Sequence, residues 1–527
     1  MKTVKYIIGI IAAASALSLS SCVGDLNVTP IDPNANTADK ALVDEASFQN
    51  FLAGVYLGFA TSGYYGADGD PSISGLDGGA SQYIRGLYHH SELTTDESVC
   101  GWNDQTIKNF HWMNWTTDDS FIYAFYSRIF MQVSMANEFI REAKASEVDF
   151  AQKQQLIDEA RVLRAIAYYH AIDNFGNVPF SDETAIVGVA PDQIKRADLY
   201  AWMEKELKDL VDNSALPAKG ATTSRASKAA AKFLLAKLYL NAEVFTGTAA
   251  YDKCADVLKD LMDDGFSLHT TSAGTYPAYQ ELFLADNNLC TDEIIFAIEQ
   301  DGVNTTSYGA TNYIIFASTG GEMNPDDMGI SSGWGGLRMT PEFYKRFSDS
   351  DARKLFYTAT QQANIDDIGE FSDGYAFMKF RNRTRDGGYG KEKGFVDTDF
   401  PMMRYADVLL MAAECQARGI SGIDGASALN AVRTRAGLGN LDCTLDNIID
   451  ERARELYQEC WRRNDLIRFG LFTSASYKWQ WKGSDTDIDG TSTDIPAYRQ
   501  LFPIPDSDRL ANTKLVQNEG YEVDAAE

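Results

Sequence analysis

The chain has 527 residues, of which 45% are hydrophobic and 12% aromatic, and it carries a formal net charge of −28. This composition is typical of a globular protein and excludes a disordered chain, while the negative charge repels phosphate and makes nucleic acid an unfavourable partner. The seven cysteines form no CxxC pair and are too sparse for a disulfide framework, so we expect most of them to be small buried apolar residues.

The first residues have the pattern of an export signal. Lys2 and Lys5 precede an apolar segment, "YIIGIIAAASALSL", that is too short and too rich in Ala and Ser for a membrane span. We therefore expect a signal peptide over residues 1–21. The residues just before Cys22 resemble the lipobox of bacterial lipoproteins, which implies that Cys22 is lipidated and anchors the protein to a membrane. The alternative is a secreted protein with an unmodified Cys22.

Residues 22–38 contain two prolines and no apolar periodicity, which predicts a lipidated tether in front of one folded domain over 39–527. Beyond a loop region at about 62–88, rich in Gly, Ser and Tyr, helical patterns dominate. In residues 150–180, apolar residues recur at the helical period, and Gly176 with Pro179 ends the helix.

Three further segments predict helices. Residues 229–240 are apolar on nearly every side, which predicts a helix buried between other helices, with Ser227 as its N-cap. In residues 399–418 the pattern is similar, and Pro401 is expected in the first helical turn. Residues 426–438 predict a short partner that ends at Gly437.

Residues 445–470 predict one continuous helix ending at Gly470. Paired helices with small residues at their contacts indicate tetratricopeptide-like hairpins, and the fold class predicted is mostly α, with scaffold segments at about 115–245 and 400–470. Between about 246 and 400, "EIIFAIEQ" and "NYIIFAS" predict strands among Gly-rich loops. Because loops on a rigid scaffold usually carry function, this inserted, partly β region is where we expect ligand binding, with binding loops at about 62–110 and 300–340.

Several segments resemble the SusD/RagB family of surface glycan-binding lipoproteins of Gram-negative bacteria. They are "EARVLRAIAYYHAIDNFGNVPF" (159–180), "RASKAAAKFLLAKLYLNAEVFTG" (225–247), "ERARELYQECWRRNDLIRFG" (451–470) and the closing "FPIP" (502–505). The resemblance implies a SusD-like fold without catalytic activity. It also implies capture of a neutral oligosaccharide at the outer membrane, facing the cell exterior, and its delivery to a SusC-like TonB-dependent transporter.

A neutral sugar needs flat aromatic faces for stacking and a few fixed polar groups. The chain is most similar to the starch-binding member of the family, and five of its residues correspond to sugar-contacting positions there: Arg85, Trp102, Gln105, Tyr308 and Trp334. Tyr308 and Trp334 fall on two of the three aromatic residues of an arc. The third position of that arc is Cys100 here, so a starch-like α-glucan is the first expectation, with a fructan or a plant β-glycan as alternatives.

The same resemblance implies a calcium site. Asp397 and Asp399 precede a predicted helix and correspond to calcium ligands, with Asp286 as a third carboxylate, and hard carboxylate oxygens suit Ca²⁺. The alternative is that Asp399 is an exposed N-cap. The five histidines show no ligand spacing, which argues against zinc.

Two other functions were compared with glycan capture. A surface glycosidase needs two carboxylates across a cleft, but the sequence lacks a P-loop and a dinucleotide fingerprint, and the family it resembles is not catalytic. A RagB-like lid that captures peptides is the other alternative. Aromatic residues clustered in Gly-rich loops favour sugar.

Overall fold

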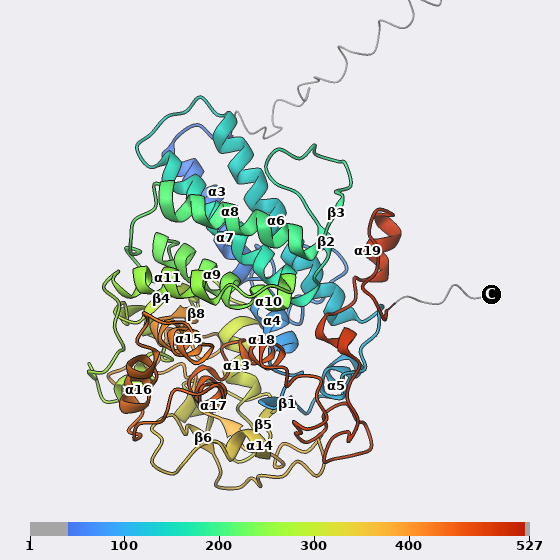
Figure 1. Cartoon of the computed structure of the whole chain (residues 1–527), viewed down its shortest axis with the longest axis vertical. Helices are drawn as coiled ribbons and strands as arrows, with labels where there is room; N and C mark the ends of the chain where they lie inside the picture. Colours follow the sequence, from blue (N-terminus) through green and yellow to red (C-terminus); the bar gives the residue numbers. More distant parts are fainter. Residues whose placement is uncertain (1–40, 522–527) are drawn as a thin grey trace, which may run out of the picture.

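The structure is a computed structural model that describes residues 41–521. The predicted signal peptide, Cys22 and the tether lie outside these residues. Figure 1 shows a helical upper part, a middle layer of further helices, and a lower part made of loops and short strands. None of the helices in residues 41–521 is both long enough and apolar enough to cross a bilayer.

The upper and middle layers form the helical scaffold. It starts with α3 (Glu45–Ala60) and α4 (Tyr83–Ser91), and α5 (Gln105–Trp112) follows. The longest helices, α6 (Ser120–Ala145) and α7 (Lys153–Asn174), pack on each other, and the next ones pack in the same successive way. These are α8 (Arg196–Asn213), α9 (Lys228–Leu240), α10 (Ala242–Thr246) and α11 (Tyr251–Met262).

The C-terminal helices complete the scaffold: α15 (Tyr405–Ala417), α16 (Gly425–Arg435), α17 (Leu445–Leu456), α18 (Arg462–Arg468) and α19 (Asp506–Ala511). Helix α15 packs on α16 and α11, which joins the two halves. The expected helical-hairpin scaffold is therefore confirmed. Ser227 caps α9 through a hydrogen bond from the Ala230 amide, and Gly437 follows α16 with a φ of +77°, a conformation that glycine adopts without strain.

The remaining elements are short strands and short helices, most of them in the middle and lower parts of Figure 1; the strand pair at residues 178–179 and 193–194 lies in the upper part, near α6. An antiparallel sheet has the order β1 (Ser98–Cys100), β5 (Leu337–Met339), β7 (Ala376–Phe377), β6 (Phe356–Tyr357), and two pairs are formed by β2 (Val178–Pro179) with β3 (Gln193–Ile194) and by β4 (Ile294–Ile298) with β8 (Phe400–Arg404). Short helices lie between them: α12 (Ala278–Glu281), η1 (Asn287–Leu289), α13 (Ala310–Ala317), η2 (Pro325–Met328), α14 (Pro341–Tyr344) and η3 (Ala497–Gln500).

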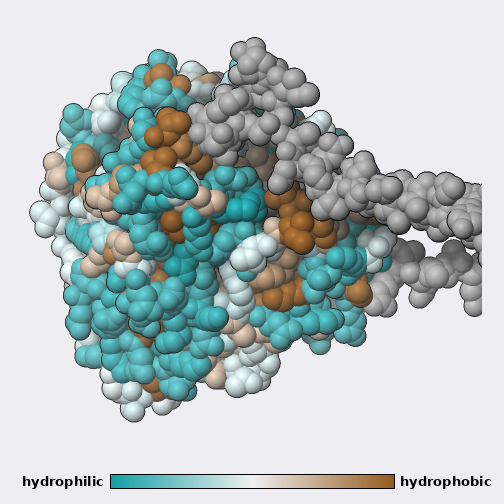
Figure 2. Space-filling model, turned by 90° about the horizontal axis from the view of Figure 1, so that it is seen from above, coloured by the Kyte–Doolittle hydropathy of each residue, from teal (hydrophilic) through white to brown (hydrophobic). Residues whose placement is uncertain are grey.

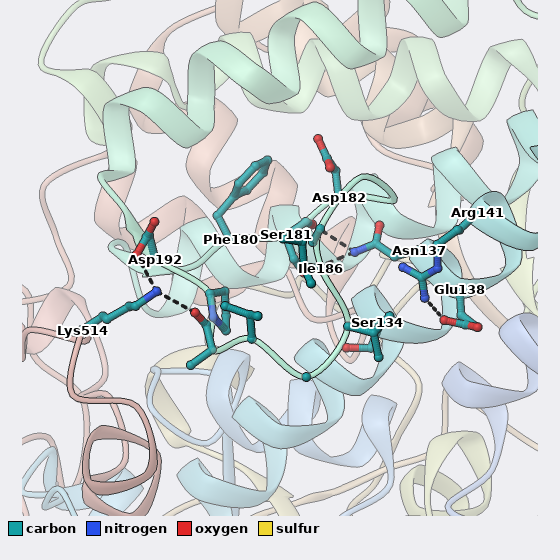
Figure 3. Close-up of a pocket in the computed structure, with 16 residues that line it drawn as sticks. Ser134, Asn137, Glu138, Arg141, Phe180, Ser181, Asp182, Ile186, Asp192 and Lys514 are labelled. Carbon is teal, nitrogen blue, oxygen red and sulfur yellow. Dashed lines mark hydrogen bonds and ion pairs between the residues drawn. The ribbon is translucent and has the colours of Figure 1, made fainter. Parts of the chain in front are cut away.

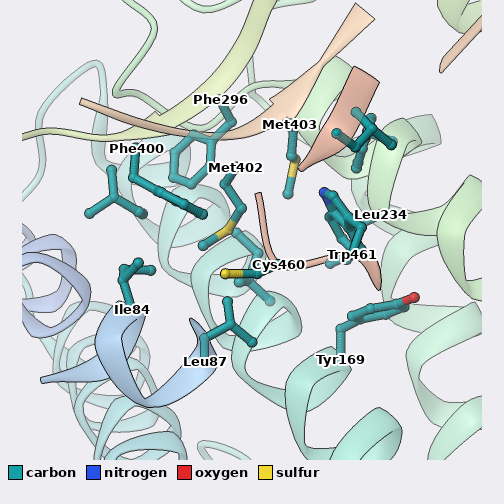
Figure 4. Packing of buried hydrophobic residues seen from close by; sticks show 14 of the residues in the cluster. Ile84, Leu87, Tyr169, Leu234, Phe296, Phe400, Met402, Met403, Cys460 and Trp461 are labelled. Carbon is teal, nitrogen blue, oxygen red and sulfur yellow. The ribbon is translucent and has the colours of Figure 1, made fainter. Parts of the chain in front are cut away.

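One continuous apolar core joins the two parts. Figure 4 shows Ile84 and Leu87 of α4 approaching Met402 of β8 and Cys460. Five of the cysteines, Cys100, Cys254, Cys290, Cys415 and Cys460, are buried free thiols, as expected for small core residues. Because helices and strands share this core, the loop-rich part is packed onto the scaffold and not merely attached to it.

Three expected elements differ from the structure. The segment "NYIIFAS" forms helix α13 and not a strand. All of its residues are buried, and the pattern of a short apolar run without periodicity does not distinguish a helix from a strand. Pro401 lies in strand β8, where the register with β4 shifts, and not in a helical turn. The predicted helix 445–470 is interrupted between α17 and α18, where Gln458 and Cys460 have positive φ angles.

Buried polar and charged side chains from distant segments bond the backbone at this interruption. The amide of Gln458 donates to Glu97 Oε1 at 2.7 Å, and Lys379 Nζ donates to the carbonyls of Glu455 and Tyr457. Backbone groups that would continue the helix are thus bonded to side chains from distant segments. Arg404 lies in the same cluster, within 2.6 Å of Glu293, 3.0 Å of Glu455 and 2.7 Å of Glu459.

We predict that Arg404→Met destabilises the protein by about 3–5 kcal/mol, because it leaves buried carboxylates without their cation. Arg404 is 1% exposed. Equilibrium unfolding in urea measures the loss. The matched control is Arg141→Met, which removes a surface pair with Glu138 and is expected to cost less than about 1 kcal/mol. Equal losses in the two variants would contradict the importance of the buried cluster.

We also predict that stability falls as the pH rises from about 4.5 to about 8. Burial raises the pKa of Glu97 from an ordinary 4.5 to about 8, so the folded state keeps a proton that the unfolded state releases. The stability that this retained proton contributes to the folded state is fully present below about pH 4.5 and is lost as the pH rises through about 8. Glu97→Gln retains the acceptor for Gln458 and should gain stability relative to the wild type across this window, by at most about 1.4 kcal/mol per pH unit. Urea unfolding of both proteins at pH 5 and pH 9 measures the difference between their free energies of unfolding. A difference that is the same at both pH values would refute the prediction.

Candidate functional site

Strand pairing brings two distant tryptophans together. In the β1–β5 pair Cys100 lies opposite Leu337, and the amide of Gly101 donates to the carbonyl of Gly336 at 3.0 Å. Trp102 is the residue directly after Gly101, and Trp334 lies two residues before Gly336. The two rings, 232 residues apart in sequence, therefore lie side by side with centroids 6.3 Å apart.

The loop that carries Trp334 is held by the end of helix α13. The amides of Trp334, Gly335 and Gly336 donate to the carbonyls of Phe316, Thr319 and Ala317 at 2.7–2.8 Å. They satisfy carbonyls that a helix end leaves without partners. Gly336 is required for close approach, because a Cβ there would lie 2.8 Å from the Trp102 ring. The glycines around Trp334 thus allow tight packing, so this loop is fixed by the helix beneath it.

Tyr308 is placed at the other end of α13. The Gln82 side chain accepts from the Arg85 amide at 2.9 Å and the Ala310 amide at 2.8 Å, and it donates to the carbonyl of Phe59 at 2.6 Å. This one buried amide side chain fixes α4 against the segment after Tyr308. The Tyr308 hydroxyl donates to Asp68 Oδ1 at 2.7 Å, and this bond to a carboxylate raises the pKa of Tyr308.

The three rings form a continuous aromatic arc, defined here as Tyr308, Trp334 and Trp102. Tyr308 and Trp334 have centroids 6.1 Å apart with planes inclined by 60°, and Trp334 and Trp102 are inclined by 51°. All three side chains are half-buried. Inclined neighbouring faces form a curved surface, which suits a chain of sugar rings better than a flat one.

Arg85 lies behind the arc. Its guanidinium is 5.3 Å from the Trp102 ring centre and 4.6 Å from that of Tyr313, and its Nη1 donates to the carbonyl of Tyr308 at 3.2 Å. Its Nε has no hydrogen-bond partner among the described residues. Burial lowers the pKa of Arg85. The Nε atom is itself buried, so a sugar hydroxyl would have to approach a different atom of the Arg85 side chain.

The last two predicted positions differ in setting. Gln105 is exposed at the start of α5, three residues after Trp102, and its Nε2 donates to Asn109 at 2.9 Å. Cys100 is buried behind Trp102 and Gly336, and burial raises the pKa of its thiol to about 11. The structure therefore brings Arg85, Trp102, Tyr308 and Trp334 into contact, leaves Gln105 at the edge, and presents no ring at position 100.

Sequence reasoning missed four residues that support the arc. Phe316 lies 5.0 Å below Trp334, Phe395 lies 5.6 Å from Tyr308, Tyr313 packs under Arg85, and Asp68 orients Tyr308. The sequence pattern predicts a strand for the segment that contains Tyr313 and Phe316, so it does not place these two side chains beneath the arc. Phe395 and Asp68 have no local signal, since their roles depend on contacts between distant loops.

The three predicted calcium ligands line one cavity of about 590 Å³. Asp286 forms an ion pair with Arg385 at 3.1 Å, and Asp397 Oδ1 accepts from the Gly302 amide at 2.8 Å. Asp399 Oδ1 accepts from the Gln300 amide at 2.8 Å, whereas its buried Oδ2 has no partner among the described residues. Burial raises the pKa of Asp399 to about 8. Asp399 does not cap a helix, because it precedes strand β8.

These residues fit a cation only in part. The unpartnered oxygen of Asp399 and the carboxylate of Asp397 could both bind a cation. The carboxylate of Asp286, by contrast, is already paired with Arg385. Within residues 41–521 no three His, Cys, Asp or Glu side chains are arranged to hold a metal ion. Calcium therefore stays a prediction that rests on Asp397, Asp399 and neighbouring backbone oxygens.

If calcium binds there, 1 mM CaCl₂ should raise the melting temperature of chelator-treated protein by several degrees at pH 7. The shift should grow as the pH rises toward 8, because binding requires the ionised form of Asp399. Asp399→Asn should abolish the shift, and Asp386→Asn, at an exposed aspartate, should not. Melting curves by differential scanning calorimetry test this, and a calcium-independent wild type would rule the site out.

A second cavity, of about 500 Å³, lies between α6 and the loop from β2 to β3 (Figure 3). Its polar groups are bonded to each other: Asn137 donates to the Ser181 carbonyl at 3.0 Å, and Lys514 pairs with Asp192 at 2.9 Å. Phe180 is the one aromatic residue in its lining. It therefore lacks the stacking faces that a sugar site needs.

The sequence Gly329–Gly333 matches G-x-S-x-G, a pattern of hydrolase nucleophiles. It lies between η2 and strand β5. A nucleophile elbow needs a strand before the serine and a helix after it. The pattern therefore carries no catalytic assignment here.

Comparisons with known proteins give one consistent result. Residues 354–521 match the profile described as "SusD family", and residues 79–240 match "Starch-binding associating with outer membrane". The "Starch-binding protein SusD" of Bacteroides thetaiotaomicron is 31% identical, over 99% of this chain and 100% of that protein. The "SusD-like protein P2" of Formosa agariphila is 27% identical, over 67% of this chain and 73% of that protein.

Solved structures share the fold. The surface glycan-binding protein A from Bacteroides fluxus matches with a TM-score of 0.71 at 21% identity, and covers 91% of this chain and 100% of its own. The protein of that name from Bacteroides thetaiotaomicron, in complex with laminarihexaose, matches with a TM-score of 0.69 at 20% identity over 90% and 100%.

Proposed function

The chain belongs to the SusD family, whose glycan-binding members are not catalytic, and from this premise we propose that it captures a neutral oligosaccharide on its aromatic arc. The observation that carries the proposal is the convergence of Tyr308, Trp334 and Trp102 from three segments into one half-exposed surface. Arg85 supplies a donor beside it. Stacking needs no charge on the ligand, which agrees with the net charge of −28.

The expected affinity follows from the size of the contacts. Covering one aromatic face with a sugar ring buries roughly 60 Å² of apolar surface, worth about 1–2 kcal/mol. Three such faces, with hydrogen bonds from Arg85 and Gln105, offset the loss of motional freedom and give a Kd between micromolar and millimolar. Because the loops are already fixed by α13 and β1, little of this energy is spent on ordering them.

A starch-like α-glucan is the substrate class we propose first. The relative named for starch binding is 31% identical along the whole chain, and the arc is curved. The absence of a ring at Cys100 shortens the curved surface, so a fructan or a plant β-glycan is the alternative. A RagB-like peptide ligand is less well supported, because exposed aromatic faces favour sugars and, within residues 41–521, Arg85 is the one cation that contacts a ring of the arc.

We further propose that the protein acts at the outer membrane and delivers its glycan to a SusC-like TonB-dependent transporter. The support is the match to a family described as associating with the outer membrane. A lipid at Cys22 would provide the attachment.

We predict that Trp334→Ala weakens glycan binding by about 10- to 30-fold, because one stacking face is lost. Isothermal titration with maltoheptaose, laminarihexaose and fructo-oligosaccharides measures the change and identifies the glycan. Trp334→Tyr retains an aromatic face and should lose less than half of that binding energy.

The control for this experiment is Gln49→Ala at an exposed position of α3 on the scaffold. It should bind like the wild type. If Trp334→Ala also binds normally while its melting temperature is unchanged, the glycan site lies elsewhere.

A further inference from the structure

We propose that the tip of the loop at residues 62–81 extends the glycan site, with Tyr64 and Tyr65 as additional stacking faces for a longer oligosaccharide. The tyrosine tip is defined as residues 63–70. This inference rests on the proposed function, because it concerns the same ligand and names the chain length that the site selects.

The loop is anchored at its base and is not a free flap. Arg128 of α6 is 2% exposed and donates from Nε to the Ser81 carbonyl at 2.7 Å, and from Nη2 to the Ser62 carbonyl at 2.9 Å. Its Nη1 donates to Ser72 Oγ at 2.9 Å. One buried guanidinium therefore bonds both ends of the loop and its middle, so the loop leaves and rejoins the scaffold at a fixed place.

The tyrosine tip is closed on itself. A Cβ on Gly63 would lie 2.5 Å from the carbonyl oxygen of Asp70, and a Cβ on Gly69 would lie 2.4 Å from Tyr65 Cβ and 2.9 Å from the carbonyl oxygen of Tyr65. Gly66 has a φ of +78°, which a larger residue adopts only with strain. The glycines let the backbone fold back tightly, with Gly69 packed against the start of the Tyr65 side chain. The large exposed fractions of Tyr64 and Tyr65 show that their rings are open to solvent.

The tyrosine tip adjoins the aromatic arc. Asp68 accepts the hydrogen bond from the Tyr308 hydroxyl at 2.7 Å, and the Ala67 amide donates to Thr306 Oγ1 at 3.3 Å. At the other end of the loop, a Cβ on Gly79 would lie 3.1 Å from Tyr308 Cβ. Tyr65 is three residues from Asp68, a separation of at most about 11 Å along the chain. Tyr65 is therefore close along the chain to the residue that bonds Tyr308, at one end of the arc.

The exposure of Tyr64 and Tyr65 and the chemistry of their side chains indicate the ligand that the tyrosine tip binds. Tyr64 is 67% exposed and Tyr65 is 84% exposed, so neither contributes to the core. Two large aromatic faces next to a sugar-stacking arc continue its chemistry, and each has a hydroxyl that can bond to the rim of a sugar ring. The same loop carries Asp68, Asp70 and Asp77, whose negative charge disfavours acidic glycans and anionic lipid. A neutral oligosaccharide longer than the arc fits these conditions.

The test compares two ligand lengths. Maltotriose and maltoheptaose, or laminaritriose and laminarihexaose if the wild type prefers the β-glucan, are titrated calorimetrically against the full-length protein. For the double variant Tyr64→Ala, Tyr65→Ala we expect about a 10-fold weaker Kd for the long oligosaccharide and an unchanged Kd for the trisaccharide.

Two controls separate stacking from other effects. The double variant Tyr64→Phe, Tyr65→Phe retains both faces and should keep most of the affinity for the long oligosaccharide. Ser74→Ala, an exposed change in the same loop, should behave like the wild type. Equal loss for both ligand lengths in the alanine variant would mean a disturbed arc, and no loss for either would mean that the tyrosines do not touch the glycan; either result overturns the inference.

The proposed function fails in a different way. A wild type that binds none of these oligosaccharides, or a Trp334→Ala variant that binds the trisaccharide as well as the wild type does, would contradict the arc itself and the inference with it. Normal dependence on Trp334 together with an indifferent tyrosine tip would leave the proposed function standing and refute the inference alone.

Discussion

The site depends on the buried ionic cluster between α17 and α18, where the helical scaffold holds the loop-rich part. Asp96 is bonded to Arg462 at 2.7 Å, and the neighbouring Glu97 accepts from the Gln458 amide. Both carboxylates lie immediately before strand β1. Strand β1 pairs with β5, and this pair sets Trp102 beside Trp334. The geometry of the arc is therefore transmitted from ion pairs in the core through one short strand.

This arrangement explains why a chain would retain so many buried charges. A buried ion pair contributes little net stability, since its desolvation penalty is comparable to its attraction. It does impose a unique position on the groups that it joins. Here the charges replace the continuation of a helix: Lys379 bonds the carbonyls of Glu455 and Tyr457, and positive φ angles at Gln458 and Cys460 turn the chain. A binding surface made of separate loops benefits from such fixed attachment.

The helical scaffold is predictable because its amphipathic helices are periodic and its fully buried helices form apolar runs too long for a strand. The N-cap at Ser227 and the stop at Gly437 were also visible in the sequence. The break at 457–461 was not, because the side chains that bond its backbone, Glu97 and Lys379, lie far away in the chain. Strand β8 and helix α13 were assigned to the wrong element for a related reason: both are buried on every side, so neither shows a period.

The site residues themselves came from the family resemblance, and their mutual geometry required the structure. Nothing local in the sequence indicates that Gln82 fixes Tyr308 through the Ala310 amide, or that Asp68 orients its hydroxyl. The flanking glycines of Trp334 suggest flexibility in the sequence. In the structure they permit close packing against α13 and Trp102, which is the opposite mechanical role.

The acidic cavity and the aromatic arc share a segment, and this has a physical consequence. Phe395 packs against Tyr308, and two residues later Asp397 accepts from the Gly302 amide. The chain runs from Gly302 to Tyr308 in six residues, so both sides of the cavity continue directly into the arc. Asp399 carries an unpartnered oxygen and its pKa is raised to about 8, so at neutral pH it is mainly protonated. Neutralisation of this carboxylate, by a proton or by a cation, removes repulsion from Glu299 and Asp397 at the base of the Tyr308 loop. The cavity and the arc are thus joined through the chain at Phe395 and Asp397, although one is acidic and the other aromatic.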